Sequence, residues 1–126
     1  MNPTQTILLV EDDPDVRAAL GLMLRTHGYE VRTANHGLDG LRKLLDQEQE
    51  RPSAIVVDLM MPVMDGWDFL QQCPEGIPIV VISGAYDVER TRTHPDVAAV
   101  IQKPVTMEAL VGAVAPLVNR NVRGNS

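Results

Sequence analysis

Several features common in other proteins are scarce in this chain. It contains a single cysteine, Cys73, so it cannot form an internal disulfide or a cysteine-rich zinc site. No apolar run approaches the roughly 20 residues that span a bilayer. The first residues lack the basic and apolar regions of a secretory signal. These absences lead us to expect a cytoplasmic protein without membrane insertion, in which Cys73 is a helix-end residue.

Positive charge is also scarce. The 126 residues include 17 Asp and Glu against 11 Lys and Arg, which gives a net charge of -6. Residues 1–68 hold 12 of the acidic and 6 of the basic residues, whereas residues 69–126 are balanced. Direct binding to nucleic acid is therefore disfavoured, because a phosphate backbone needs a basic surface. The net negative charge is thus confined to residues 1–68.

The length fits one domain, since domains commonly have about 100–200 residues, and 44% of the residues are hydrophobic. We expect a single domain over residues 1–120 and a disordered tail or linker stub over residues 121–126. Short apolar runs, separated by helical patterns, predict strands. These runs are residues 7–10, 29–34, 54–57, 79–82 and 97–102.

Local signals predict where the helices begin and end. Asp13 is expected to cap a first helix with Pro14 at its first position, and Thr106 to cap the last helix. Gly40 weakens the second helical stripe by about 1 kcal/mol relative to Ala. Pro116 predicts a kink or an early end of the last helix, because its ring clashes with the preceding turn.

Five β/α units imply a doubly wound α/β fold, with a five-stranded parallel sheet and helices on both faces. In such a sheet, ligands bind beyond the carboxyl ends of the strands. Polar residues follow four of the predicted strands at these ends: Glu11, Asp12, Asp13, Asp58, Ser83 and Lys103. Asp13 is the weakest site candidate among them, because a helix cap accounts for it.

Crowded carboxylates repel one another unless a cation neutralises them. Mg²⁺ suits such a site, because it prefers one or two carboxylates together with water and a phosphate oxygen. Glu11, Asp12 and Asp58 carry three negative charges, and Mg²⁺ with Lys103 would balance them. A neutral site of this kind could receive a phosphoryl group.

The chain resembles the receiver domains of two-component response regulators. The matching segments cover nearly the whole chain: ILLVEDDP at residues 7–14, DLMMPVMDG at 58–66, IPIVVIS at 77–83 and QKP at 102–104. The resemblance implies a (βα)5 flavodoxin-like fold with strand order 2-1-3-4-5. It also implies phosphorelay signal transduction in place of enzymatic turnover, since such a protein catalyses only its own phosphorylation and a slow autodephosphorylation.

The resemblance also implies a role for each site residue. Asp58 would be the phosphoacceptor, and Ser83 and Lys103 would contact the phosphoryl group. Asp12, Asp58 and the backbone carbonyl of Met60 would bind Mg²⁺ directly, and Glu11 would do so through water. The Lys103–Pro104 bond would be cis.

Its implied partners are a sensor histidine kinase or a histidine phosphotransfer protein. A downstream protein target would bind the face made by the fourth helix, fifth strand and fifth helix, and phosphorylation could promote a dimer. The sequence is compatible with a stand-alone regulator and with a receiver excised from a longer protein.

Some positions depart from the family pattern. Val100 occupies a place where many receivers have an aromatic residue that switches inward, and the fourth helix, around residues 87–93, is short and poor in apolar residues. Met60 and Ala85 cannot orient an attacking water, which predicts slow loss of the phosphoryl group.

Two other functions stay open. One is an adaptor that acts without phosphorylation, favoured by the altered switch position. The other is a Mg²⁺-dependent phosphatase that works through an aspartyl phosphate, disfavoured because Met60 stands where such enzymes often have an acidic residue.

Overall fold

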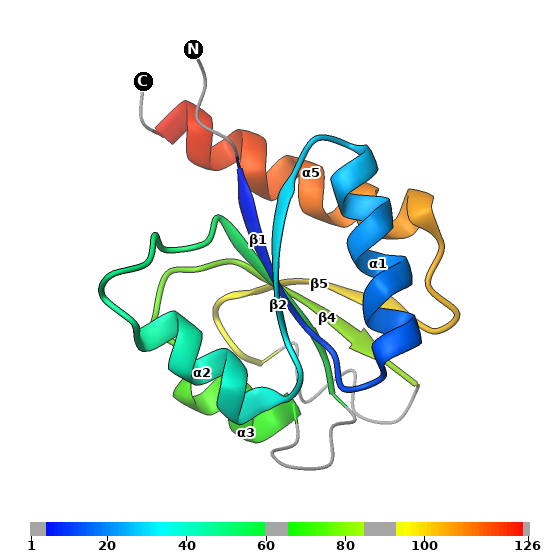
Figure 1. Ribbon diagram of the computed structural model, residues 1–126. Coiled ribbons are helices and arrows are strands. Elements are labelled where there is room, and N and C mark those ends of the chain that lie inside the picture. Colours follow the sequence, from blue (N-terminus) through cyan, green and yellow to red (C-terminus); the bar gives the residue numbers. More distant parts are fainter. Residues whose placement is uncertain (1–4, 60–65, 85–92, 125–126) are drawn as a thin grey trace.

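The computed structural model describes residues 5–59, 66–84 and 93–124, which form a parallel sheet with helices on both faces (Figure 1). The elements are β1 (Thr6–Val10), α1 (Pro14–Thr26), β2 (Glu30–Ala34), α2 (Gly37–Leu45), β3 (Ala54–Asp58), α3 (Gly66–Gln72), β4 (Ile79–Ser83), β5 (Val97–Gln102) and α5 (Met107–Gly124). The predicted fourth helix lies outside the described residues.

The five strands are all parallel and lie in the order β2-β1-β3-β4-β5. This confirms the predicted fold and strand order. Strands β1, β3 and β4 are buried along their whole length, which explains why their sequences are almost continuously apolar.

Two core layers lie on opposite faces of the sheet. Helices α1 and α5 cover one face, and α2 and α3 cover the other (Figure 1). Burial of these apolar side chains supplies most of the driving force for folding. Because the strands are parallel, the loops that carry the polar residues after them start at the same edge of the sheet.

Gly40 serves packing, which the sequence interpretation did not foresee. A Cβ atom built at this position would lie 3.0 Å from Cε1 of Phe69 and 3.1 Å from Cγ2 of Val10. Residue 40 must therefore be small for α2 to approach β1 and α3 this closely. The close contact therefore requires glycine at position 40, although glycine lowers the stability of the helix itself.

Both predicted helix caps are confirmed. The Asp13 carboxylate accepts the backbone N–H groups of Asp15 and Val16, at 2.9 and 3.2 Å. The Thr106 hydroxyl accepts the N–H of Ala109 at 3.1 Å. These bonds satisfy backbone donors that have no partner within the helix.

Of the two outcomes predicted at Pro116, the early end is wrong, because α5 continues through Pro116 to Gly124; the kink stays a prediction. The helix is anchored on the sheet by buried apolar residues on both sides of the proline: Leu110, Val114, Leu117 and Val118. An established helix gains one hydrogen bond for each further residue, and α5 extends to Gly124. The division into a domain over residues 1–120 and a tail over residues 121–126 stays a prediction. None of the described helices is long and apolar enough to cross a membrane.

A register shift interrupts the pairing of β4 with β5. Ile79 pairs with Val97 and Val80 pairs with Ala99, so that Ala98 has no partner in the ladder. Because of this extra residue, Val97 and Val100 both pack on the core layer beneath α2 and α3. Val100, the position that lacks an aromatic residue, is thus partly buried in that layer.

Candidate phosphoacceptor site

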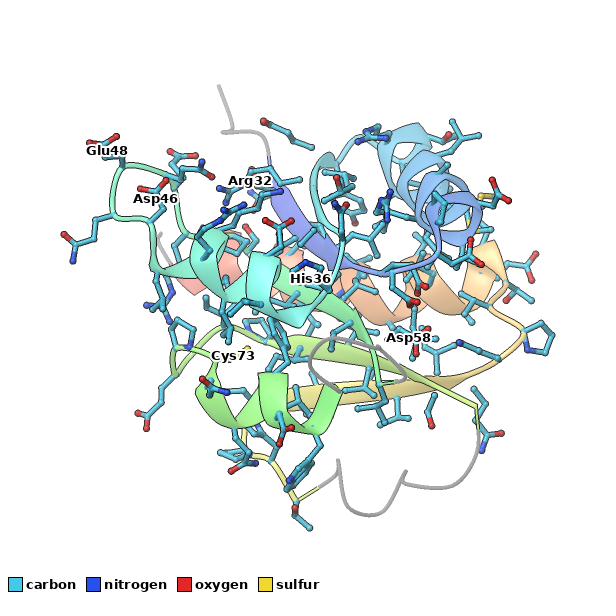
Figure 2. The ribbon with its side chains drawn as sticks, turned by 60° about the horizontal axis from the view of Figure 1, so that its bottom comes forward. Arg32, His36, Asp46, Glu48, Asp58 and Cys73 are labelled. Atoms are coloured by element: carbon cyan, nitrogen blue, oxygen red, sulfur yellow. The ribbon has the colours of Figure 1, made fainter. Side chains whose placement is uncertain are left out.

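Three carboxylates meet at the carboxyl edge of the sheet. Glu11 and Asp12 follow β1, and Asp58 is the last residue of β3. One oxygen of each lies within 4.8 Å of the others, and only 2% of the surface of Glu11 and of Asp58 is exposed. Figure 2 shows Asp58 apart from the group formed by Arg32, Asp46 and Glu48. Parallel strand ends thus bring together the acidic residues that sequence reasoning selected.

Backbone bonds shape the turn that carries two of these acids. The N–H of Glu11 donates to the carbonyl of Ala34 at 3.1 Å, which continues the pairing of β1 with β2 beyond the strand. The N–H of Asp13 then donates to Oε1 of Glu11 at 3.2 Å. Asp13 itself uses its carboxylate as the cap of α1 and is not part of the carboxylate cluster within the described residues.

Lys103 is the cation of the cluster. Its Nζ donates to Oδ2 of Asp58 at 2.7 Å, and this hydrogen bond raises the pKa of Lys103 despite partial burial. The N–H of Lys103 donates to the carbonyl of Ser83 at 3.0 Å, which fixes the start of the loop after β5. The Lys103–Pro104 bond is cis, as the resemblance implied.

The buried carboxyl group of Glu11 has a raised pKa. Burial raises its pKa from 4.5 to about 7. The nearby carboxylates of Asp58 and Asp12 raise it further, whereas the hydrogen bond from the N–H of Asp13 lowers it. Oε2 of Glu11 is buried and has no hydrogen-bond partner among the described residues. A buried carboxylate oxygen without a partner is costly, and a bound cation would remove that cost.

Ser83 is buried at the end of β4, next to Ile82, which pairs in register with Asp58. The structure therefore places Ser83 at the same edge of the sheet as the carboxylates. Met60 and Ala85 lie outside the described residues, so their predicted roles stay predictions.

Sequence reasoning missed Arg17 of α1. Its Nη1 donates to the carbonyl of Glu11 at 2.9 Å. A signal was present in the sequence, because a cation in the first turn of a helix is unfavourable next to the positive end of the helix dipole. Its presence there indicates that the side chain has some other favourable interaction. The structure shows that interaction.

Cys73 has no place in this chemistry. It lies just after α3 and is partly buried, and burial raises the pKa of its thiol to about 12, with a contribution from the charge of Asp96. This agrees with its interpretation as a helix-end residue.

The chain matches the response regulator receiver domain family over residues 7–115. It is 34% identical to the transcriptional regulatory protein GlrR of Escherichia coli over 113 residues, 86% of this chain and 25% of that protein. It is 35% identical to the transcriptional regulatory protein PrrA of Mycobacterium tuberculosis over 119 residues, 90% of this chain and 50% of that protein. The chain thus spans between a quarter and half of the length of these relatives.

Solved structures share the fold of this chain. A CheY-like receiver domain protein from Methanospirillum hungatei shares the fold, with a TM-score of 0.85 and 24% identity over 97% of this chain and 99% of that one. The receiver domain of sensor histidine kinase PA1611 from Pseudomonas aeruginosa, with a magnesium ion in its active site cleft, has a TM-score of 0.77 and 26% identity over 93% and 99% of the two chains. The chain belongs to the response regulator receiver domain family, the receivers of two-component systems.

Proposed function

We propose that the chain is a phosphoacceptor, in which Asp58 takes a phosphoryl group from a phosphohistidine of a kinase or phosphotransfer protein. A carboxylate oxygen of Asp58 attacks phosphorus, the P–N bond to histidine breaks, and the leaving imidazole nitrogen keeps the bonding electrons. The observation that carries the proposal is the convergence of Asp58, two further carboxylates and Lys103 at one edge of the sheet.

The residues present fit a Mg²⁺ ion. Glu11, Asp12 and Asp58 would hold it, and the unpartnered Oε2 of Glu11 is an oxygen without another use among the described residues. The resemblance adds the Met60 carbonyl as a further ligand. When bound, the ion would neutralise the crowded carboxylates and the oxygens of the incoming phosphoryl group. The magnesium ion in the PA1611 receiver domain supports this choice of metal.

The residues of the chain would orient and stabilise the group. Lys103, already 2.7 Å from Asp58, would pair with a phosphoryl oxygen, and the hydroxyl of Ser83 would donate to another. Since positioning and charge stabilisation supply most of the catalysis in phosphoryl transfer, no further acid or base is required. The chain is thus a signalling acceptor that catalyses its own phosphorylation and slow autodephosphorylation, and no enzyme of another substrate.

The kinase partner would act in the cytoplasm, and the signal would leave through the face that includes β5 and α5. A phosphorylation-dependent dimer belongs to the same proposal. The adaptor that acts without phosphorylation is the second candidate, because Val100 packs in the core layer as an aliphatic side chain where many receivers have an aromatic switch.

The test is incubation of the protein with Mg²⁺ and acetyl phosphate, followed by mass spectrometry and peptide mapping. We expect one acid-stable, base-labile phosphoryl group on Asp58, and none on the Asp58→Asn variant. Absence of label, together with no spectroscopic response to beryllofluoride, would favour the adaptor. Release of phosphate from many small esters without a kinase would favour the phosphatase.

A further inference from the structure

Arg17 reaches from α1 back to the acidic turn that precedes the helix. Its Nη1 donates to the carbonyl of Glu11 at 2.9 Å and lies 3.5 Å from the carbonyl of Asp12. Its own N–H donates to the carbonyl of Asp13 at 2.8 Å, as the first bond of α1. One half-buried side chain therefore contacts the backbone of both acidic residues that follow β1.

Together with other hydrogen bonds, this contact holds the backbone of the turn at residues 11–13 from both sides, and we call this set of bonds the frame. On one side, the N–H of Glu11 donates to Ala34 of β2, and within the turn the N–H of Asp13 donates to the Glu11 carboxylate. The carbonyls of Glu11 and Asp12 point the other way, toward Arg17. Because the Cα atoms of Glu11 and Asp12 belong to this backbone, the frame determines where their carboxylates lie relative to Asp58.

We propose that Arg17 is a positioning residue for the divalent-cation site, which it serves by holding the Glu11–Asp12 backbone so that both carboxylates face Asp58. The inference rests on the proposed Mg²⁺ site, and it assigns no contact between Arg17 and the ion. Residues that orient metal ligands in this indirect way commonly change metal affinity about 10- to 100-fold when they are mutated.

The charge of Arg17 and its proposed positioning role predict opposite effects of its removal on Mg²⁺ affinity. Its guanidinium is positive, so by Coulomb's law alone it weakens the binding of a cation nearby, and its removal would tighten binding. If Arg17 positions the ligands, its removal weakens binding instead. The sign of the change in affinity therefore separates the two explanations.

Arg25 provides a matched control on the same helix. Its Nη2 also donates to a backbone carbonyl, that of Val31 at 3.3 Å, but this carbonyl belongs to β2 and not to the acidic turn. Replacing Arg25 by Met changes the net charge of α1 by the same amount as replacing Arg17, without touching the frame.

The experiment is isothermal titration calorimetry with MgCl₂ on the wild type, Arg17→Met, Arg17→Lys and Arg25→Met, each checked for cooperative unfolding in EDTA. We expect Arg17→Met to bind Mg²⁺ about tenfold more weakly than the wild type. Arg17→Lys should retain part of the affinity, because an ammonium can still donate to one carbonyl, and Arg25→Met should match the wild type.

Each outcome bears on the inference. Wild-type affinity or tighter binding in Arg17→Met overturns it while leaving the proposed function intact. Equal weakening in Arg17→Met and Arg25→Met also overturns it, because the frame is then irrelevant. Should Arg17→Met not fold, Arg17→Lys and Arg17→Gln decide by the same comparison. A wild type that binds no Mg²⁺ refutes the proposed function itself, and the inference with it.

Discussion

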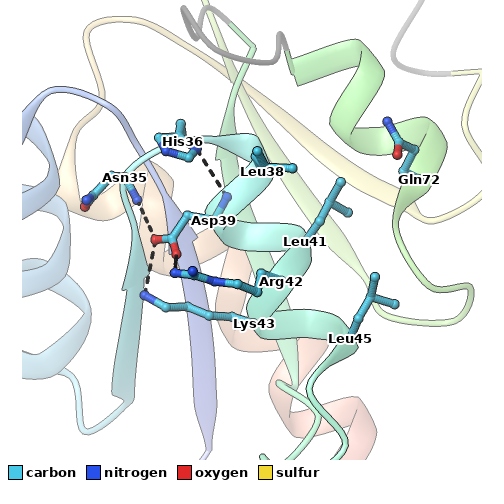
Figure 3. Close-up of a pocket in the computed structure, with 9 residues that line it drawn as sticks. All are labelled: Asn35, His36, Leu38, Asp39, Leu41, Arg42, Lys43, Leu45 and Gln72. Carbon is cyan, nitrogen blue, oxygen red and sulfur yellow. Dashed lines mark hydrogen bonds and ion pairs between the residues drawn. The ribbon is translucent and has the colours of Figure 1, made fainter.

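Two ionic clusters in this molecule use the same kinds of side chain to different ends. One is the carboxyl-edge cluster of Glu11, Asp12, Asp58 and Lys103. The other, the α2 cluster, consists of Asp39, Arg42 and Lys43 of helix α2 (Figure 3). There, Asp39 pairs with Arg42 at 2.7 Å and with Lys43 at 3.3 Å, beside a hollow of about 770 Å³ over α2.

The α2 cluster is satisfied by its own neighbours. Burial alone would raise the pKa of Asp39, but the N–H of Asn35 and the two cations lower it below its usual 3.8. In return, the N–H of Asp39 donates to Nδ1 of His36, the cap of α2. Figure 3 shows these bonds gathered around the first turn of the helix.

The carboxyl-edge cluster is not satisfied in this way. It has three carboxylates and one ammonium, the pKa of Glu11 is raised, and one oxygen of Glu11 has no partner among the described residues. The two clusters thus differ in their balance of charge. The α2 cluster is locally neutral or positive, and the carboxyl-edge cluster keeps a surplus of buried negative charge.

Addition of Mg²⁺ should give the largest difference in stability between variants of the two clusters. At a Mg²⁺ concentration 100 times the dissociation constant, we expect the free energy of unfolding to rise by about 2.7 kcal/mol. Urea denaturation with and without the metal measures this. Asp12→Asn should lose the effect and Asp39→Asn should keep it; equal stabilisation of both variants would place the ion elsewhere.

Removal of a basic side chain should also change the free energy of unfolding by different amounts in the two clusters. Lys103→Met leaves Asp58 without its 2.7 Å partner, and we expect a loss of about 2 kcal/mol in EDTA, less than for a fully buried pair because Lys103 is partly exposed. The matched variant Arg42→Met removes a side chain that is 80% exposed and should cost about 0.5 kcal/mol or less. Similar losses in urea denaturation would contradict the difference between the clusters.

The pH dependence of stability should have opposite signs in the two clusters. The pKa of Glu11 rises from 4.5 to about 7 on folding, so the metal-free folded state binds more protons than the unfolded state in this window. Stability should therefore fall as pH rises from 4.5 to 7, by on the order of 1–2 kcal/mol once solvent screening is allowed for. Denaturation of the wild type and Glu11→Gln in EDTA checks this, and the variant should lack that fall.

The contribution of Asp39 should be the smallest. Because folding lowers its pKa below 3.8, its stabilisation is present above that pH and is lost as pH falls through the lowered value. We expect Asp39→Asn to cost about 0.5 kcal/mol at neutral pH and nothing at pH values below the lowered pKa. A cost that persists in strong acid would show that Asp39 acts as an uncharged cap.

The convergence of the candidate site residues was predictable from the sequence because of one topological rule. Parallel strands end at one edge, so acidic residues at the ends of β1 and β3 and a lysine after β5 must converge there. The exact pairing was not predictable, because side-chain geometry decides which of the three carboxylates Lys103 contacts, and that is Asp58. Arg17 escaped notice because its partners are backbone carbonyls. A cation in the first turn of a helix was a sign of it in the sequence, but it does not say which groups the side chain contacts.

What the sequence by itself determined is the order and type of the elements, since apolar runs, caps and breakers act over a few residues. Asp13, Thr106 and the run ending at Asp58 are of this kind. The tertiary structure alone decided the features that depend on distant partners. Gly40 is needed because Phe69 and Val10 lie against it, and α5 passes Pro116 because burial on both sides outweighs a local penalty. Local free energies are small, and packing overrides them wherever a segment can bury enough apolar surface.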